Sequence, residues 1–149
     1  MTKKDNKKTL GEILLVEDNP GDVRLIVESL IEEDLQYNLH VASDGVEALE
    51  FLRHTGKHEK SPRPDLVLLD LNLPRKNGVE VLEEIKIDED LRRIPVIILT
   101  ASQAQEDILT AYNLYANCYL VKPIDLNQYY TLIDAIRDFW LTKATLAEK

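Results

Sequence analysis

Hydrophobic residues along this chain form four uninterrupted runs, and a polar residue follows each run at once. The runs occupy positions 13–16, 66–69, 96–99 and 118–121. Because they do not alternate with polar positions, they predict strands that are covered on both faces, as in a parallel sheet. A shorter segment at residues 39–41 predicts one more strand.

Between these runs, apolar residues recur every three or four positions, which is typical of amphipathic helices. Helices are predicted after residues 19–22, from Gly45, from Asn77-Gly78, over about 103–115 and after Asp125, which suits an N-cap. The stripe of the final helix that is expected to be buried consists of Leu126, Tyr129, Ile133, Ile136 and Trp140.

Five strands that alternate with five helices predict an α/β fold with a five-stranded, parallel, doubly wound sheet. Right-handed crossovers and helices on both faces fit the flavodoxin-like strand order 2-1-3-4-5, which places strands one and three side by side. We expect the domain to span residues 11–142, with a flexible N-terminal tail over 1–10 and a C-terminal tail over 143–149.

Composition and charge narrow the class of protein. The 149 residues suit one domain, and the net charge of −9 argues against nucleic-acid binding, which needs clustered Lys and Arg. No apolar run approaches the ~18 residues that span a bilayer, and no secretory signal opens the chain. With a single cysteine as well, we expect a cytoplasmic protein. The segment 53–63, with four basic residues against one Glu, is expected to be a surface loop.

Carboxylates stand at the ends of two predicted strands that should be neighbours. Glu17 and Asp18 follow the first run, and Asp70 follows the third strand. Such a cluster needs a cation, and an oxygen-only ligand set suits Mg²⁺. We expect Asp18 and Asp70 to be direct ligands, Glu17 to bind directly or through water, and Asn72 to add its backbone carbonyl. The alternative is that these acids are solvated residues at strand ends.

Asp70 is then a candidate nucleophile, because an aspartate carboxylate can take up a phosphoryl group as an acyl phosphate. That reaction needs positioning and charge neutralisation, which the Lys122 ammonium and the Thr100 hydroxyl could supply from neighbouring strand ends. Alone, Lys122 would be read as a surface lysine. Pro123 argues against that interpretation, since a cis Lys122–Pro123 bond, which we expect, would fix the direction of the lysine.

These residues match a family pattern. Glu17-Asp18, Asp70 with Leu73-Pro74 and Gly78, Thr100-Ala101 and Lys122-Pro123 resemble, in order and spacing, the receiver domains of two-component response regulators over roughly residues 11–142. The resemblance implies that Asp70 is the phosphoacceptor and that the acids and the Asn72 carbonyl hold the metal. It also implies that Thr100 and Lys122 form the switch hydroxyl and lysine, and that Tyr119 is the aromatic residue that swings inward on activation.

Several segments narrow the resemblance to the stand-alone regulators that serve cyanobacterial-type phytochromes. These segments are 56–64, Leu71-Asn72-Leu73-Pro74, Asn117-Cys118-Tyr119 and Phe139-Trp140. The resemblance implies a sensor histidine kinase as the phosphate donor, with a phytochrome as the particular candidate. We expect a single-domain signalling protein rather than an enzyme, one that promotes its own phosphorylation and dephosphorylation.

Two other kinds of protein could carry an aspartate at such a site. A phosphatase with an aspartate nucleophile typically has a second acid two residues later, where this chain has Asn72. A pseudo-receiver that only binds partners would not need the complete set of acids, Thr100 and Lys122.

Aromatic residues off the predicted helix stripes suggest a twofold homodimer through the fourth helix, fifth strand and fifth helix, or alternatively they complete a monomer core. They are Tyr112, Tyr115, Tyr130 and Phe139.

Overall fold

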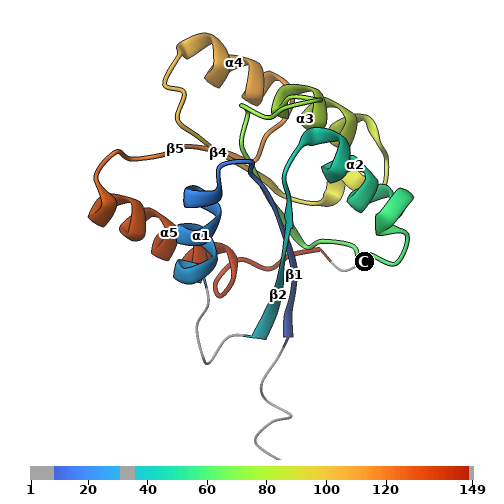
Figure 1. Cartoon of the computed structure of the whole chain (residues 1–149), viewed down its shortest axis with the longest axis horizontal. Helices are drawn as coiled ribbons and strands as arrows, with labels where there is room; N and C mark the ends of the chain where they lie inside the picture. The colour runs from blue at the N-terminus through green and yellow to red at the C-terminus, as the bar shows by residue number, and fades with distance from the viewer. Residues whose placement is uncertain (1–8, 31–35, 148–149) are drawn as a thin grey trace, which may run out of the picture.

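The computed structural model describes residues 9–30 and 36–147, and its five strands form one parallel sheet in the order β2-β1-β3-β4-β5 (Figure 1). The strands are β1 (Thr9–Val16), β2 (Gln36–Ala42), β3 (Leu66–Leu69), β4 (Val96–Thr100) and β5 (Cys118–Val121). The predicted fold class and strand order are therefore confirmed. Residues 1–8 and 148–149 of the expected tails lie outside the described residues.

Five helices cover the two faces of this sheet. They are α1 (Pro20–Leu30), α2 (Gly45–Arg53), α3 (Gly78–Ile87), α4 (Gln105–Asn113) and α5 (Leu126–Trp140). Short 3-10 turns lie at Gly56–His58 and Leu91–Arg93. Helices α1 and α5 pack together on one face, while α2, α3 and α4 cover the other (Figure 1). No helix within the described part of the chain is long and apolar enough to cross a membrane.

The uninterrupted apolar runs are explained by this two-sided packing. Along β1, Leu14 packs into the core beneath α2, α3 and α4, whereas its neighbour Leu15 packs into the core beneath α1 and α5. Leu69 and Leu68 divide between the same two cores on β3. Successive side chains of a strand point to opposite faces, so a strand with helices on both sides needs apolar residues at every position.

Side chains at the helix starts fix where the loops end. Asp125 and Asn77 were expected at helix starts, and the side chain of each accepts a hydrogen bond from a backbone N–H in the first turn of its helix. Asn77 also forms a reciprocal capping box with Glu80. Such caps satisfy backbone donors that have no partner inside the helix. The loops after β3 and β5, which carry the candidate site, therefore end at defined residues.

Some element boundaries differ from those predicted. Strand β2 is longer than residues 39–41, because it pairs with β1 from Gln36 to Ala42. Helix α4 ends at Asn113 because the chain enters the left-handed region at Tyr115, where φ is 68°. Strand β5 is half-buried rather than buried, since it lies at the edge of the sheet.

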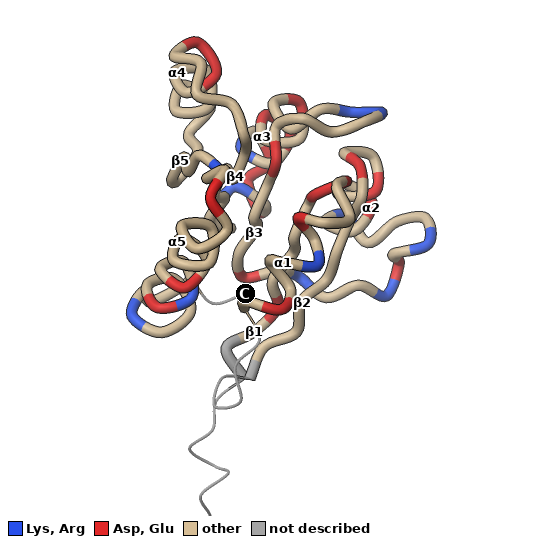
Figure 2. Tube along the Cα trace, turned by 60° about the vertical axis from the view of Figure 1, so that its left-hand side comes forward, with Lys and Arg blue, Asp and Glu red and all other residues tan. Residues whose placement is uncertain are grey.

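The basic segment 53–63 follows α2 at the surface, as predicted, and Lys and Arg positions stand out along it (Figure 2). Much of its positive charge is already paired. Lys57 lies 3.0 Å from Glu47, and Arg63 lies 2.7 Å from Asp90. The segment therefore offers far less free positive charge than its sequence suggests.

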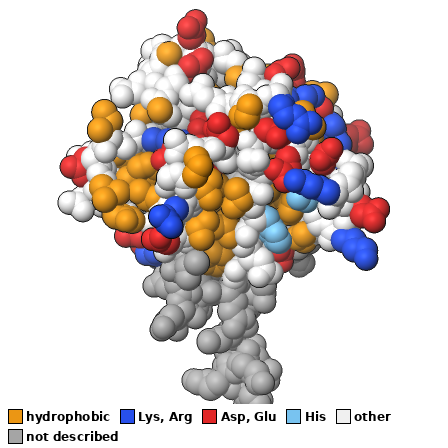
Figure 3. Space-filling model, in the orientation of Figure 1, with side chains coloured by type: hydrophobic (Ala, Val, Ile, Leu, Met, Phe, Trp, Pro, Cys, Tyr) orange, Lys and Arg blue, Asp and Glu red, His pale blue; other side chains and the backbone are white. Residues whose placement is uncertain are grey.

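Hydrophobic side chains remain exposed on the α5 side of the molecule, where Figure 3 shows them gathered. Tyr130 and Phe139 are exposed, as their positions off the helix stripe predicted. Leu126 is also exposed, so its predicted burial was wrong. It is the first residue of α5, and the core beneath that helix begins one turn later, at Tyr129.

We predict that Gly78→Ala destabilises the fold and disturbs the site. A Cβ at Gly78 would lie 2.3 Å from the backbone oxygen of Asp70 and 2.6 Å from the Cα of Leu71. Backbone cannot move aside as a side-chain tip can, so we expect a loss of about 1–3 kcal/mol in unfolding free energy, measured by chemical denaturation.

Gly21→Ala is the matched control. The closest atom to a Cβ there is the side-chain oxygen of Asn19, at 3.2 Å. We expect a change of less than about 1 kcal/mol, because alanine also favours a helix over glycine. Equal stability of the two variants would show that the contact between Gly78 and the backbone of Asp70 does not constrain the loop.

Candidate functional site

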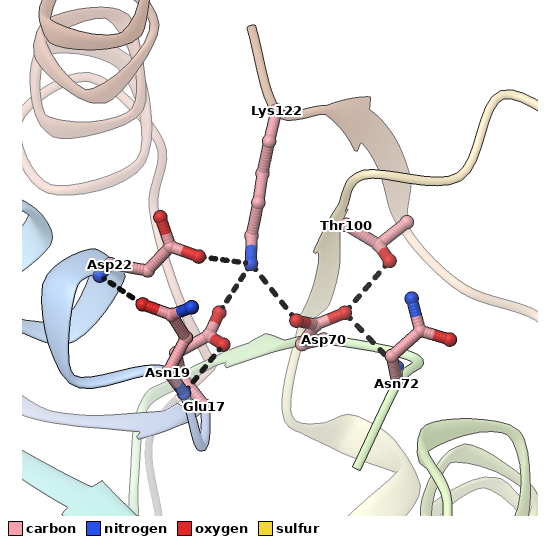
Figure 4. A network of polar contacts seen from close by, with 7 residues as sticks. All are labelled: Glu17, Asn19, Asp22, Asp70, Asn72, Thr100 and Lys122. Carbon is pink, nitrogen blue, oxygen red and sulfur yellow. Dashed lines mark hydrogen bonds and ion pairs between the residues drawn. The ribbon is translucent and has the colours of Figure 1, made fainter. Parts of the chain in front are cut away.

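The polar residues at four strand ends meet at one edge of the sheet (Figure 4). Backbone pairing between neighbouring strands brings them there. Asp70 donates its N–H to the Val16 carbonyl at the end of β1, and Lys122 donates its N–H to the Thr100 carbonyl at the end of β4. The edge at the carboxyl ends of parallel strands is where ligands bind in such folds.

Asp70 is buried at this edge, with 5% of its surface exposed, and both of its carboxylate oxygens are occupied. Oδ1 accepts hydrogen bonds from the Thr100 hydroxyl at 2.7 Å and from the Asn72 N–H at 3.1 Å. Oδ2 lies 2.9 Å from the Lys122 ammonium. Burial of a carboxylate is costly without such partners, so the surrounding donors explain how Asp70 is tolerated here.

Lys122 places its ammonium among three carboxylates. Its Nζ lies 2.6 Å from Glu17, 2.9 Å from Asp70 and 2.9 Å from Asp22, and its side chain is only 9% exposed. Burial alone would lower the pKa of Lys122, but the hydrogen bonds to the three carboxylates outweigh burial and raise it. The interpretation of Lys122 as a surface lysine is therefore excluded.

Asp22 is the member of this arrangement that sequence reasoning missed. The sequence indicates only that residues 19–22 precede a helix, and acidic residues are common at such a position. The spacing of four residues between Asp18 and Asp22 was a signal, because an acid in the first helical turn after β1 can face the same sheet edge. Its bond to Lys122, a hundred residues away in the chain, required the fold to bring them together.

The predicted cis bond between Lys122 and Pro123 was wrong. No peptide bond is cis in the described ranges 9–30 and 36–147, so this one is trans. The trans form is the favoured one even before proline. The direction of the lysine is set instead by the Thr100 carbonyl, which holds its backbone, and by the carboxylates, which hold its ammonium.

Glu17 is buried, with 2% of its surface exposed, and its pKa is shifted. Burial raises the pKa of Glu17 to about 7, and the charge of Asp70 adds to this, while Lys122 and the Asn19 N–H oppose it. Repulsion from the neighbouring acid Asp70 is secondary to burial here. Near neutral pH, Glu17 can therefore hold a proton.

Glu17, Asp18 and Asp70 each offer a carboxylate oxygen, and these oxygens lie within 4.8 Å of one another. Asp18 is exposed, while the other two are buried. Three carboxylates at this spacing form a donor set that suits a hard divalent cation. The structure thus brings together the three acids that the sequence predicted. The Asn72 carbonyl as a ligand stays a prediction.

Tyr119 lies on β5 close to the site and is held at both ends. Its hydroxyl donates to the Ser102 carbonyl at 2.9 Å, and its backbone N–H donates to the Tyr112 hydroxyl at 3.1 Å. Its ring packs against the core that lies beneath α2, α3 and α4. These contacts tie the loop after β4 to β5, whereas the switching role expected of Tyr119 stays a prediction.

The parallel sheet and the paired aspartate at its edge define a receiver domain, and comparison with known families agrees. The model of the response regulator receiver domain matches residues 13–134. The chain therefore belongs to the receiver domain family of response regulators, and it is a signalling protein of that kind rather than an enzyme of metabolism.

Particular relatives place the chain within this family. It is 47% identical to response regulator Rcp1 of Synechocystis sp. over 90% of this chain and 91% of Rcp1. It is 40% identical to the probable methanogenesis regulatory protein FilR2 of Methanothrix harundinacea, over 87% of this chain and 83% of FilR2.

Solved structures of two related regulators superimpose closely on this fold. The Mn²⁺-bound form of Rcp1 has a TM-score of 0.90 and 46% identity, covering 92% of this chain and 99% of the other. The phosphorylated cyanobacterial phytochrome response regulator RcpA has a TM-score of 0.89 and 46% identity, covering 92% and 98%. The chain is therefore related to phytochrome response regulators.

We predict that affinity for a divalent cation falls as the pH is lowered through 7. A cation needs the unprotonated form of Glu17, whose pKa is raised to about 7, so protons compete with it below that value. Between pH 8 and pH 6 the affinity for Mg²⁺, measured by calorimetric titration, should fall about tenfold if one proton is displaced.

Glu17→Gln provides the control for this measurement, because glutamine has no carboxyl group that titrates in this pH range. Its affinity for Mg²⁺ should be lower and nearly independent of pH across the same range. A wild-type protein with pH-independent affinity would show that Glu17 is not a ligand.

Proposed function

We propose that this chain accepts a phosphoryl group from a sensor histidine kinase onto Asp70, in a Mg²⁺-dependent two-component phosphorelay. One observation carries this proposal. The Asp70 carboxylate lies between an ammonium at 2.9 Å and a hydroxyl at 2.7 Å, beside two further acids that could hold a cation. Those are the groups that an aspartate needs in order to take up and keep a phosphoryl group.

The transfer forms one bond and breaks one. A carboxylate oxygen of Asp70 attacks phosphorus, the bond from phosphorus to the histidine nitrogen of the kinase breaks, and its electron pair stays on the imidazole. Asp70 then carries an acyl phosphate. Attack of water on this phosphorus later returns the free carboxylate and releases inorganic phosphate, which ends the signal.

The residues around Asp70 have separate parts in this reaction. Lys122 stabilises negative charge on one phosphoryl oxygen, and the Thr100 hydroxyl donates to another. A divalent cation held by Glu17, Asp18, Asp70 and the Asn72 carbonyl neutralises phosphoryl charge when it is bound. We favour Mg²⁺ because it takes few carboxylates and keeps sites for phosphate oxygens.

The partner that we propose is a phytochrome with histidine kinase activity. Support comes from the 46% identity to RcpA, which is described as a cyanobacterial phytochrome response regulator. The overlay covers 92% of this chain, so the relation extends well beyond the residues of the site.

Phosphorylation should depend on Asp70 and on Mg²⁺. With a small labelled phosphodonor such as acetyl phosphate, we expect label on the wild type with Mg²⁺, none without it, and none on Asp70→Asn. Lys122→Ala should still bind Mg²⁺ but fail to change the surface near α4 and α5 on phosphorylation. Labelling is measured by intact mass and by loss of label in hydroxylamine, which cleaves acyl phosphates.

Asp134→Asn is the control for the loss of one acidic charge, because Asp134 lies on α5 with Arg137 as its partner. It should be labelled like the wild type. Label that persists in Asp70→Asn would place the nucleophile elsewhere. Continuous release of phosphate without labelled protein would instead favour the phosphatase alternative.

We also propose that the chain forms a twofold dimer through α4, β5 and α5, tightened by phosphorylation. Tyr112 and Tyr115 are exposed at the end of α4, and Phe139 is exposed on α5. Exposed aromatic residues on adjoining elements are typical of protein interfaces. In sedimentation at micromolar concentration, Tyr115→Ser with Phe139→Ser should shift the protein to monomer.

The matched control is Ile87→Ser, because Ile87 is an exposed hydrophobic residue at the end of α3, outside the proposed interface. It should leave the assembly unchanged. A wild type that stays monomeric with and without a phosphoryl mimic would mean that the aromatic residues have another role.

A further inference from the structure

Asp22 is bound to Lys122, although it stands apart from the acid cluster beside Asp70. It lies in the first turn of α1, where its backbone N–H donates to the side chain of Asn19 at 3.0 Å. From there its carboxylate reaches the Lys122 ammonium at 2.9 Å, opposite Asp70 (Figure 4). The lysine on which phosphoryl transfer depends is therefore shared with a carboxylate that has no part in the transfer.

All three hydrogen-bond donors of the ammonium are matched by a carboxylate in this state. Glu17, Asp22 and Asp70 supply one acceptor each. A phosphoryl oxygen on Asp70 would be one more acceptor. If Lys122 is to donate to the phosphoryl oxygen and also keep its hydrogen bond to Asp70, its ammonium must lose the hydrogen bond to either Glu17 or Asp22.

Exposure decides which of the two carboxylates is released. The Glu17 side chain is 2% exposed and lies closer to the ammonium, at 2.6 Å, so loss of Lys122 would leave its oxygen in the protein interior without that hydrogen bond. The Asp22 side chain is 26% exposed, and water can reach it. Loss of an ion pair costs least where water replaces the partner, so Asp22 is the carboxylate that Lys122 can leave.

A second donor lies near Asp22. Tyr129 on α5 is buried, with 5% of its surface exposed, and its hydroxyl has no hydrogen-bond partner among the described residues. Burial raises the pKa of this phenol, and the charge of Asp22 raises it further. Asp22 also contacts the hydroxyl as a weak acceptor, outside the geometry of a full hydrogen bond, so the two side chains lie beside each other.

We infer that Asp22 is a positioning residue for Lys122, whose ammonium it shares with Asp70 in the resting protein and releases when a phosphoryl group arrives. The released carboxylate then accepts a hydrogen bond from Tyr129. Because Asp22 lies on α1 and Tyr129 on α5, this exchange connects the state of Asp70 to the contact between those helices. The inference rests on the proposed function, since it assumes that Asp70 is phosphorylated.

The test compares Asp22→Asn with the wild type in the complete chain. The phosphoryl mimic beryllofluoride is titrated at saturating Mg²⁺, and Mg²⁺ is titrated alone. Without the competing carboxylate, we expect beryllofluoride to bind about three- to tenfold more tightly, as for loss of a partly exposed charged contact. The affinity for Mg²⁺ alone should be unchanged or lower, because one negative charge is lost nearby. Structural damage would weaken both.

Glu28→Gln is the matched control, because it also removes one negative charge from α1, but at a side chain that pairs with Arg24 at the surface. Both affinities should equal those of the wild type. Asp22→Ser, which removes the carboxylate with a smaller side chain, should give the same tighter binding as Asp22→Asn. Beryllofluoride that binds Asp22→Asn no more tightly than the wild type overturns the inference.

Tyr129→Phe tests the second half of the exchange. It should weaken beryllofluoride binding when Asp22 is present and have no effect in the Asp22→Asn background, so that the two substitutions are not additive. An equal effect in both backgrounds removes Tyr129 from the exchange. A wild type that neither binds beryllofluoride nor takes up label contradicts the proposed function itself, which keeps the two failures distinct.

Discussion

The ammonium of Lys122 is the interaction on which the rest of this site depends. Two of the acids around it, Glu17 and Asp70, are buried at the edge of the sheet, and unpaired charges there would be costly. A single cation within 3 Å of both makes their burial possible. It also connects the ends of β1, β3 and β5 with the first turn of α1 through Asp22.

The parallel sheet brings these groups together without special loop structure. In the order β2-β1-β3-β4-β5, the strands that carry Asp70 and Thr100 are neighbours, and the strand that carries Glu17 lies on the other side of Asp70. All strands point the same way, so every side chain that follows a strand lies at the same edge. Gly78 is required there because the start of α3 lies against the backbone of Asp70.

Charge balance is the property of the site that bears most directly on the proposed phosphorylation of Asp70. Lys122 has more carboxylate partners than one positive charge can neutralise, and burial raises the pKa of Glu17 to about 7, so Glu17 can hold a proton near neutral pH. A cation or a phosphoryl group at Asp70 would compete with these side-chain contacts. The contacts of Lys122 reach α1 through Asp22, while Tyr119 ties the loop after β4 to β5.

The sequence by itself determined the sheet, its strand order, the helix caps at Asn77 and Asp125, and the meeting of Glu17, Asp18, Asp70, Thr100 and Lys122. These follow from local patterns, because apolar runs, cap residues and strand ends are properties of neighbouring positions. Only the tertiary structure decided that Lys122 binds Asp22 and that burial rather than repulsion dominates the acidity of Glu17. Each of these depends on atoms that approach from distant parts of the chain, and no local pattern records which of several carboxylates a buried ammonium will reach.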